Sequence, residues 1–80
     1  MNPVQSRMAR AALGWTIADL ARAAEVSANT VNRFESGNDA RISSVGKMRS
    51  TMEAAGVEFI AENGGGAGVR LRKPGPVKPS

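Results

Sequence analysis

Residues 16–37 read TIADLARAAEVSANTVNRFESG, and this stretch holds the strongest local folding signals in the chain. Thr16 precedes a periodic apolar run and Asp19 stands three residues later, the capping-box pattern that marks a helix N-terminus. Ser27 provides a second N-cap signal three residues after Ala24. The stretch therefore predicts one helix that ends near Ala24, a tight turn, and a second helix that begins at once.

The two predicted helices have distinct apolar and polar faces. In the first, an inward stripe keeps helical spacing: Ile17, Leu20, Ala21 and Ala24. In the second, Val31 and Phe34 share an inward face, and the other residues point elsewhere: Ala28, Asn29, Asn32 and Arg33. Two helices joined by a tight turn, the second with a polar outward face, have the geometry of a helix-turn-helix.

One further helix is predicted on each side of this pair. The first begins at Asn2, an N-cap followed by a proline, and ends at Gly14. Its apolar residues keep the spacing of one helix face: Val4, Met8, Ala11 and Ala12. The last helix is capped by Ser43 or Ser44 and continues to Gly56. Its apolar residues also keep helical spacing: Val45, Met48, Met52 and Ala55.

The composition changes near residue 63, where glycine and then proline become frequent. Residues 57–61 are β-prone and residues 69–72 alternate between apolar and basic side chains, so together they predict a β-hairpin. The glycine-rich residues 63–68 lack the following helix and the Lys-Ser/Thr pair of a phosphate-binding loop. We therefore interpret them as a flexible hairpin loop.

The predicted fold is mainly α, with four short helices followed by a C-terminal β-hairpin. We expect a helical domain over residues 1–56, a hairpin over residues 57–72 and a disordered tail over residues 73–80. A chain of 80 residues buries a small core, so we expect a homodimer to supply additional stability.

The residue inventory excludes several classes of function. The chain has no His and no Cys, which removes the commonest general base, the commonest metal ligand and any disulfide. Its carboxylates are scattered, so we expect no enzyme, no cofactor, no metal and no small-molecule substrate. No apolar run reaches the roughly 20 residues of a membrane span, so we expect a cytoplasmic protein without membrane contact.

The positive charge is concentrated at the C-terminus. The formal net charge is +4, yet residues 1–69 contain seven basic and seven acidic residues, which cancel. The excess comes from the last four basic residues: Arg70, Arg72, Lys73 and Lys78. We interpret this run as a solubilising tail that could add nonspecific attraction to DNA. An argument for nucleic-acid binding must therefore rest on the position of residues rather than on bulk charge.

Residues 16–37 resemble the Cro/CI-type (XRE) helix-turn-helix regulators of phages and bacteria, and the resemblance extends over residues 4–57. It rests on residue types at matching positions: Leu20, Ala21, Val26, Ser27, Val31, Phe34, Glu35 and Gly37. The resemblance implies a lambda-repressor-like four-helix domain. One departure is Glu25, because the family usually has glycine in this turn, where a non-glycine residue at positive φ is strained.

The resemblance also implies a DNA-reading face. Base contacts come from the helix after the turn: Ala28, Asn29, Asn32 and Arg33. Asparagine can pair with adenine and arginine with guanine in the major groove. Phosphate contacts flank this face: Arg7, Ile17, Ser27, Thr30 and Arg41. Ile17 replaces the family's frequent Gln, so only backbone N–H groups remain at that helix start. The competing interpretation of the polar residues is an ordinary solvated helix face.

Arg10 and Glu35 match a family pair that joins the first helix to the end of the helix after the turn. Such a pair could orient Arg10 toward a phosphate. We instead interpret it as a structural ion pair, because removing one partner would leave a partly buried charge.

The implied function is a sequence-specific DNA-binding transcriptional regulator, a repressor in our interpretation, that binds an inverted repeat of double-stranded DNA as a homodimer. The hairpin is the expected dimer interface, since two strands are too few to be stable alone. Its apolar residues form that expected interface: Val57, Phe59, Ile60, Val69 and Leu71. The alternative is a protein-interaction module, an antitoxin or anti-activator, which the neutral charge of residues 1–69 favours.

Overall fold

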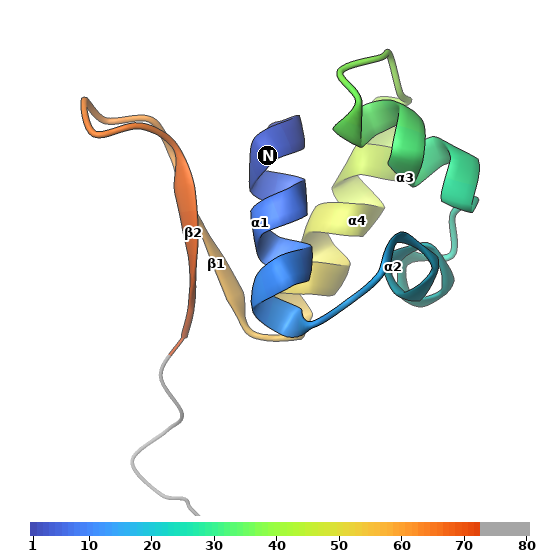
Figure 1. The fold of residues 1–80 in the computed structure, drawn as a ribbon, viewed down its shortest axis with the longest axis horizontal. Helices are drawn as coiled ribbons and strands as arrows, with labels where there is room; N and C mark the ends of the chain where they lie inside the picture. Colours follow the sequence, from blue (N-terminus) through green and yellow to red (C-terminus); the bar gives the residue numbers. More distant parts are fainter. Residues whose placement is uncertain (73–80) are drawn as a thin grey trace, which may run out of the picture.

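The computed structural model describes residues 1–72, which form four helices and a two-stranded antiparallel sheet (Figure 1). The elements are α1 (Pro3–Leu13), α2 (Ile17–Ala24), α3 (Ala28–Glu35), α4 (Ile42–Ala54), β1 (Val57–Ile60) and β2 (Gly68–Leu71). The mainly α fold with a C-terminal hairpin is therefore confirmed. The predicted disordered tail, residues 73–80, lies outside the described residues. Among residues 1–72, no helix is long and apolar enough to cross a membrane.

The α2–α3 pair forms where its capping residues predict. The Asp19 backbone N–H donates to Thr16 Oγ1 at 3.0 Å, and the Thr16 N–H donates to the Asp19 carboxylate at 2.9 Å. At the start of α3, the Thr30 N–H donates to Ser27 Oγ at 3.0 Å. Between the helices Glu25 adopts φ 59° and ψ 45°, the left-handed conformation that glycine occupies more easily. In Figure 1, α2 is seen nearly end-on while α3 runs across the view, so the axes of the two helices are steeply inclined to each other.

The hydrophobic core is shared by all four helices and the first strand. Its buried members are Ala9, Leu20, Ala21, Ala24, Val31, Met48, Met52 and Val57. The inward stripe predicted for α2 is confirmed, because three of its four residues are in this core and Ile17 packs against it. Phe34 also packs against the core, with part of its side chain exposed.

The buried face of α1 is not the face that its apolar spacing indicated. The buried residues of this helix are Gln5, Ser6 and Ala9. Val4 is 49% exposed, and Ala11 and Ala12 are exposed as well. Two polar side chains therefore occupy positions that hydrophobic periodicity assigns to solvent. This arrangement is stable because both have hydrogen-bond partners inside the fold.

Gln5 uses its whole side-chain amide. Its Oε1 accepts a hydrogen bond from the Asn2 N–H at 2.9 Å, which completes a capping box at the start of α1. Its Nε2 donates to the backbone carbonyls of Ile60 and Gly68, at 2.9 and 3.0 Å. Because these carbonyls belong to opposite strands and flank the connecting loop, one side chain attaches the loop end of the hairpin to α1.

The start of α4 also differs from the prediction. The helix begins at Ile42 with Arg41 as its N-cap, and no side-chain hydrogen bond caps it. Ser43 and Ser44 lie inside the first turn, where the backbone is already helical and cannot adopt the extended conformation of an N-cap. The helix ends at Ala54, two residues before Gly56. The first backbone N–H groups of α4 thus have no cap from a side chain.

The hairpin packs one face against the helices. Val57 pairs with Leu71 and Phe59 with Val69 in an antiparallel register. Successive residues along a strand point to opposite faces, and residues two apart share a face. These four residues therefore lie on the same face as the fully buried Val57. In Figure 1 the hairpin stands beside α1, on the side away from α2 and α3. The strands are each four residues long, one fewer than predicted for β1.

Candidate nucleic-acid interface

The outward face of α3 is available to a ligand. Its four residues are exposed: Ala28, Asn29, Asn32 and Arg33. Val31, on the opposite side of the helix, is fully buried. Within residues 1–72, no hydrogen bond engages the side chains of Asn29, Asn32 or Arg33. These amide and guanidinium groups can therefore form hydrogen bonds with an external partner without breaking any in the protein.

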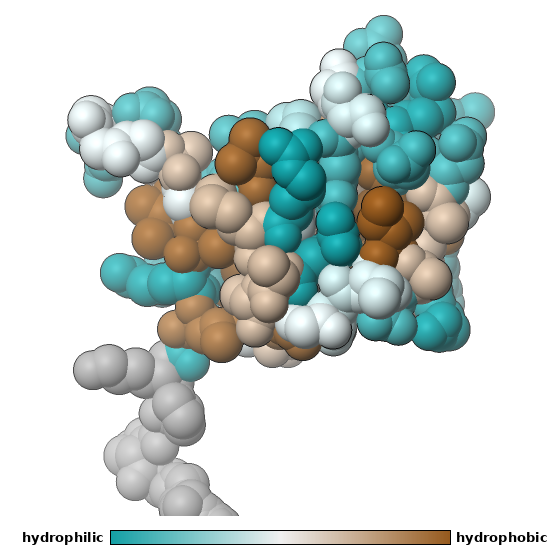
Figure 2. Space-filling model, viewed as in Figure 1, coloured by the Kyte–Doolittle hydropathy of each residue, from teal (hydrophilic) through white to brown (hydrophobic). Residues whose placement is uncertain are grey.

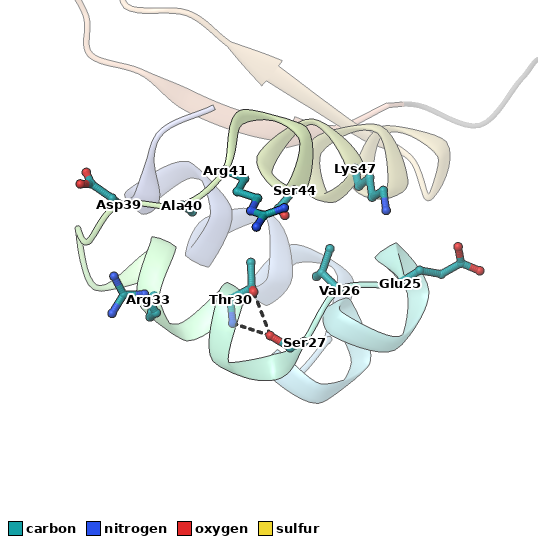
Figure 3. Close-up of a pocket in the computed structure, with 10 residues that line it drawn as sticks. All are labelled: Glu25, Val26, Ser27, Thr30, Arg33, Asp39, Ala40, Arg41, Ser44 and Lys47. Carbon is teal, nitrogen blue, oxygen red and sulfur yellow. Dashed lines mark hydrogen bonds between the residues drawn. The ribbon is translucent and has the colours of Figure 1, made fainter.

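A groove lies beside this face, between α3 and the N-terminal half of α4 (Figure 3). The polar residues that face across it are Ser27, Thr30, Arg33, Arg41, Ser44 and Lys47. They come from three separate segments: the turn before α3 and α3 itself, the loop after α3, and α4. The groove exists because α2 packs against both α3 and α4, which places the start of α3 opposite the start of α4.

The charges in the groove are arranged unevenly. Figure 3 shows Arg41 and Lys47 on the α4 side, Arg41 directed toward Thr30 and Lys47 toward the α2–α3 turn at Val26. The two carboxylates, Glu25 and Asp39, lie at opposite ends of the groove and point away from its centre. The middle of the groove therefore combines cations with hydroxyl groups, which suits an anion.

Ser27 and Thr30 form a hydroxyl pair at the floor of the groove. Their oxygens are 2.8 Å apart, and Ser27 Oγ also accepts the Thr30 backbone N–H at 3.0 Å. Two hydroxyl groups carry two protons, and the hydrogen bond between them uses one. Whichever oxygen donates, the other hydroxyl proton remains for an external acceptor. The pair can therefore donate one hydrogen bond to an anion while keeping the α3 cap.

Glu35 holds the end of α3 against α1. Its side chain is 4% exposed and receives hydrogen bonds from Arg10 Nη2 at 2.6 Å, Arg10 Nε at 2.8 Å and Ser6 Oγ at 2.6 Å. Burial works to raise the pKa of this carboxyl, but the hydrogen bonds from Arg10 and Ser6 and the nearby positive charges outweigh it, so the pKa is lowered. Arg10 also donates to the Trp15 carbonyl at 3.1 Å. The geometry makes Arg10 part of the scaffold rather than of the groove.

Two of the five expected phosphate-contact residues lie outside the groove. Arg7 donates a hydrogen bond to the backbone carbonyl of Glu35, at the opposite end of α3 from Ser27. Ile17 begins α2 and packs against the core, and its side chain has no hydrogen-bonding group. The other three do line the groove: Ser27, Thr30 and Arg41.

The sequence interpretation missed two groove residues, Ser44 and Lys47. With Arg41 they occur at intervals of three along the chain, a spacing that places them on one side of a helix. This signal was available in the sequence. A helix start predicted at Ser43 or Ser44 leaves Arg41 outside the helix and so obscures this spacing.

The structure also limits the expected hairpin interface. Val57 is 0% exposed in the protein's own core, so it has no surface to offer a second subunit, and that part of the expectation is wrong. Phe59 and Val69 pack against the same core and are half-buried. Ile60 is half-buried, and Leu71 is 50% exposed. Of the five residues, Leu71 retains the most accessible side chain.

Helices α2 and α3 are joined by a tight turn and each buries one face in the core, while the outward face of α3 is polar and borders a cationic groove. This arrangement is that of a helix-turn-helix protein. The family model for the helix-turn-helix domain matches residues 7–58, which is more than half of the chain. The chain belongs to this helix-turn-helix family, and membership points to a DNA-binding regulator. No curated protein matches the sequence. Within residues 1–72, no group of three or more Asp or Glu residues is placed to hold a metal ion.

Proposed function

We propose that this protein is a cytoplasmic, sequence-specific DNA-binding regulator of the Cro/CI type, without enzymatic activity, that places α3 in the major groove. The observation that carries the proposal is the exposed face of α3, free of internal hydrogen bonds, beside a groove lined by cations and hydroxyls. An α-helix fits the width of the major groove, where each base pair presents a distinct pattern of donors and acceptors.

Each exposed residue of α3 has a separate chemical role in base recognition. Arg33 can donate two hydrogen bonds to guanine, and Asn29 or Asn32 can pair with adenine. Ala28 can contact a thymine methyl group. Asn29, Asn32 and Arg33 have no hydrogen-bond partner within residues 1–72 that DNA would have to replace. The free-energy difference between a correct and an incorrect base is therefore not reduced by the loss of an internal hydrogen bond.

The groove supplies contacts to the DNA backbone. Lys47 and Arg41 attract a phosphate, and the hydroxyl pair of Ser27 and Thr30 donates to it from the floor of the groove. Ser44 stands in the uncapped first turn of α4, where backbone N–H groups also favour an anion. Phosphate contacts fix the register of α3 on the duplex without reading sequence.

The proposed regulator acts as a homodimer on an inverted repeat. One helix-turn-helix reads a short half-site, and two copies about one helical turn apart, roughly 34 Å, give useful affinity and specificity. A dimer that occupies a promoter site excludes polymerase from that site, so repression is the effect on transcription that we propose.

The test combines selection of preferred duplexes from a random pool with salt-titrated binding of the purified chain. Arg33→Ala should weaken the preferred duplex by about 1–3 kcal/mol and relax the preference at one base position. Lys47→Ala should weaken all duplexes alike and reduce the salt dependence by about one phosphate contact. Arg49→Ala is the matched control, because Arg49 is also a cation on α4 but stacks on Phe59, 5.4 Å from the ring centroid, outside the groove.

The opposing result is equally clear. If the wild-type chain binds all duplexes weakly and alike, and Arg33→Ala changes nothing, the helix-turn-helix does not read DNA. The protein-interaction module, a partner of another regulator or a toxin, would then be the better account.

A further inference from the structure

The loop of the hairpin brings a side-chain amide next to an unhindered backbone nitrogen. Asn63 is the only asparagine in the sequence that is followed by glycine, and both residues are exposed. The carbon of an asparagine amide is an electrophile, and the backbone nitrogen of the following residue is a nucleophile within its reach. Gly64 carries no Cβ that would hinder the approach of the two atoms.

A carboxylate accepts the proton of that nitrogen. Glu62 Oε2 accepts the Gly64 N–H at 3.2 Å and the Gly66 N–H at 3.0 Å. A weak nucleophile is activated when a base within hydrogen-bond reach takes up its proton. The residue that closes the loop through two hydrogen bonds therefore also holds a base against the Gly64 nitrogen.

The carbonyl oxygen of the Asn63 amide faces a donor. Asn63 Oδ1 accepts the Gly65 backbone N–H at 3.4 Å. Negative charge develops on this oxygen when a nucleophile adds to the amide carbon, and a backbone N–H directed at the oxygen stabilises that charge. Gly64 and Gly66 adopt φ 99° and 89°, so the loop that aligns these contacts depends on conformations that favour glycine.

The nitrogen of the same amide is not held in place. Among residues 1–72, the hydrogen bond of the Asn63 side chain is made by its oxygen, and no acceptor engages Nδ2. The group that would have to leave is therefore exposed to solvent. Nucleophile, base, oxyanion donor and leaving group thus all lie within residues 62–65.

From these contacts we infer that Asn63 is a site of self-catalysed deamidation, assembled by Glu62, Gly64 and Gly65. The Gly64 nitrogen forms a bond to Asn63 Cγ, and its proton passes to the Glu62 carboxylate. The bond from Cγ to Nδ2 breaks, and the proton leaves with that nitrogen as ammonia. This step gives a cyclic imide and restores the carboxylate. Water then opens the imide at either carbonyl and yields aspartate or isoaspartate.

The modification changes the charge of the chain at a place apart from α3. One neutral amide becomes a carboxylate, so the formal net charge falls by one unit from +4. In Figure 1 the loop ends the hairpin, on the side of α1 away from α2 and α3. The inference therefore goes beyond the proposed function and does not rest on it, because the exposed face of α3 takes no part in the reaction.

Timed incubation of the purified full chain in neutral buffer, followed by trypsin cleavage and mass spectrometry, tests the inference. Asn63 is in the tryptic peptide 50–70, and Asn38 is in the peptide 34–41. Asn38 is the internal control, because it is also exposed in a loop but is followed by Asp39. The Asn63 peptide should convert into two products of equal mass that separate by chromatography, while the Asn38 peptide keeps its amide. A digest at zero time corrects for conversion during cleavage.

Glu62→Gln tests the role of the carboxylate, because glutamine keeps an oxygen that accepts N–H groups but does not take up the proton. This variant should convert Asn63 at least about tenfold more slowly, less than the roughly 10²-fold or more of a base in an enclosed site, since Glu62 is exposed. Glu25→Gln is the matched control, since it makes the same change at an exposed glutamate outside the hairpin. Circular dichroism should show that both variants remain folded.

Three results would overturn the inference. Asn63 could keep its amide as long as Asn38 does, which would show that the loop does not promote the reaction. A Glu62→Gln chain that converts at the wild-type rate would show that the carboxylate is not the base. Equal slowing by Glu62→Gln and Glu25→Gln would assign the effect to the net charge of the chain rather than to the loop.

Discussion

The Glu35 carboxylate is buried and accepts three hydrogen bonds, two from Arg10 and one from Ser6. It sits at the end of α3, so these bonds fix the orientation of the proposed reading helix relative to α1. A buried ion pair of this kind adds little more to the free energy of unfolding than apolar residues of similar size would. Removing only one partner, however, lowers the free energy of unfolding strongly. The remaining charge then lies in a low-dielectric environment without compensation.

Glu35→Ala should therefore reduce the free energy of unfolding by about 3 kcal/mol, because the Arg10 guanidinium would lose its counter-ion. Urea unfolding measured by circular dichroism gives this value. Glu53→Ala is the control, since Glu53 pairs with Arg49 but is 40% exposed, and exposed pairs contribute about 1 kcal/mol or less. Equal losses for the two variants would show that the Glu35 pair is not buried in solution.

The same carboxyl predicts a pH dependence of stability. The pKa of Glu35 is lowered in the folded state, so folding favours its ionised form. This contribution is present in full above the unfolded pKa, about 4.3, and is lost as the pH falls through the lower folded pKa. The melting temperature of the wild type should thus fall below about pH 4.3, and Glu35→Gln should show a shallower fall. Parallel curves would assign the acid sensitivity to other carboxyls.

The α2–α3 turn carries local strain at one residue. Glu25 adopts φ 59°, where a side chain at Cβ costs roughly 1 kcal/mol or more relative to glycine. Glu25→Gly should raise the free energy of unfolding by about 0.5–1 kcal/mol, after the larger entropy of glycine in the unfolded chain is subtracted. Thermal unfolding measures the change, and Glu25→Ala is the control because it removes the charge but keeps the strain. A glycine variant no more stable than the alanine variant would contradict strain as the cause.

The side chain of Gln5 hydrogen-bonds α1 to the hairpin, in addition to the apolar packing between them. Gln5 Nε2 donates to both strands, and each such bond contributes about 1 kcal/mol. Gln5→Ala should therefore make hairpin amides exchange with solvent several-fold faster while amides of α4 change less. Native-state hydrogen exchange measured by NMR resolves the two groups. Val4→Ala, one residue earlier on α1 and 49% exposed, is the control that should leave hairpin exchange unchanged.

The whole chain has a small core, and the hairpin is part of it. Val57 is fully buried, and Phe59 and Val69 pack against the core from the same sheet face. Complete burial of one such side chain stabilises by roughly 1.5–3 kcal/mol, a large share of the stability of a small domain. The hairpin is therefore an integral layer of the helical domain rather than an appendage.

A chain that ends at Gly56 should accordingly lose most of its cooperative unfolding transition, whereas a chain that ends at Arg72 should keep it. Calorimetry of the two truncations makes the comparison, and the longer one is the matched control because it retains both strands. A cooperative transition near the full-length melting temperature in the chain that ends at Gly56 would show that the helices fold independently of the hairpin.

The α2–α3 unit could be predicted closely because its signals are local. Thr16 with Asp19, and Ser27 with Thr30, satisfy helix ends through hydrogen bonds that span three residues. The polar face of α3 follows from the position of Val31, since a helix repeats every 3.6 residues. The exposure of this face, and with it the candidate reading surface, is therefore implied by the sequence of a short segment.

Other features depended on contacts between distant parts of the chain. The buried face of α1 is decided by Ser6 and Gln5, whose partners lie 29 to 63 residues away. The groove exists because packing brings Arg41, Ser44 and Lys47 to the same side of the molecule as Ser27 and Thr30. A polar side chain can be buried when the fold provides its hydrogen-bond partner, and no local pattern records whether it will. Local hydrogen bonds made the helices and turns predictable, whereas the tertiary structure alone decided which faces they bury and which residues meet.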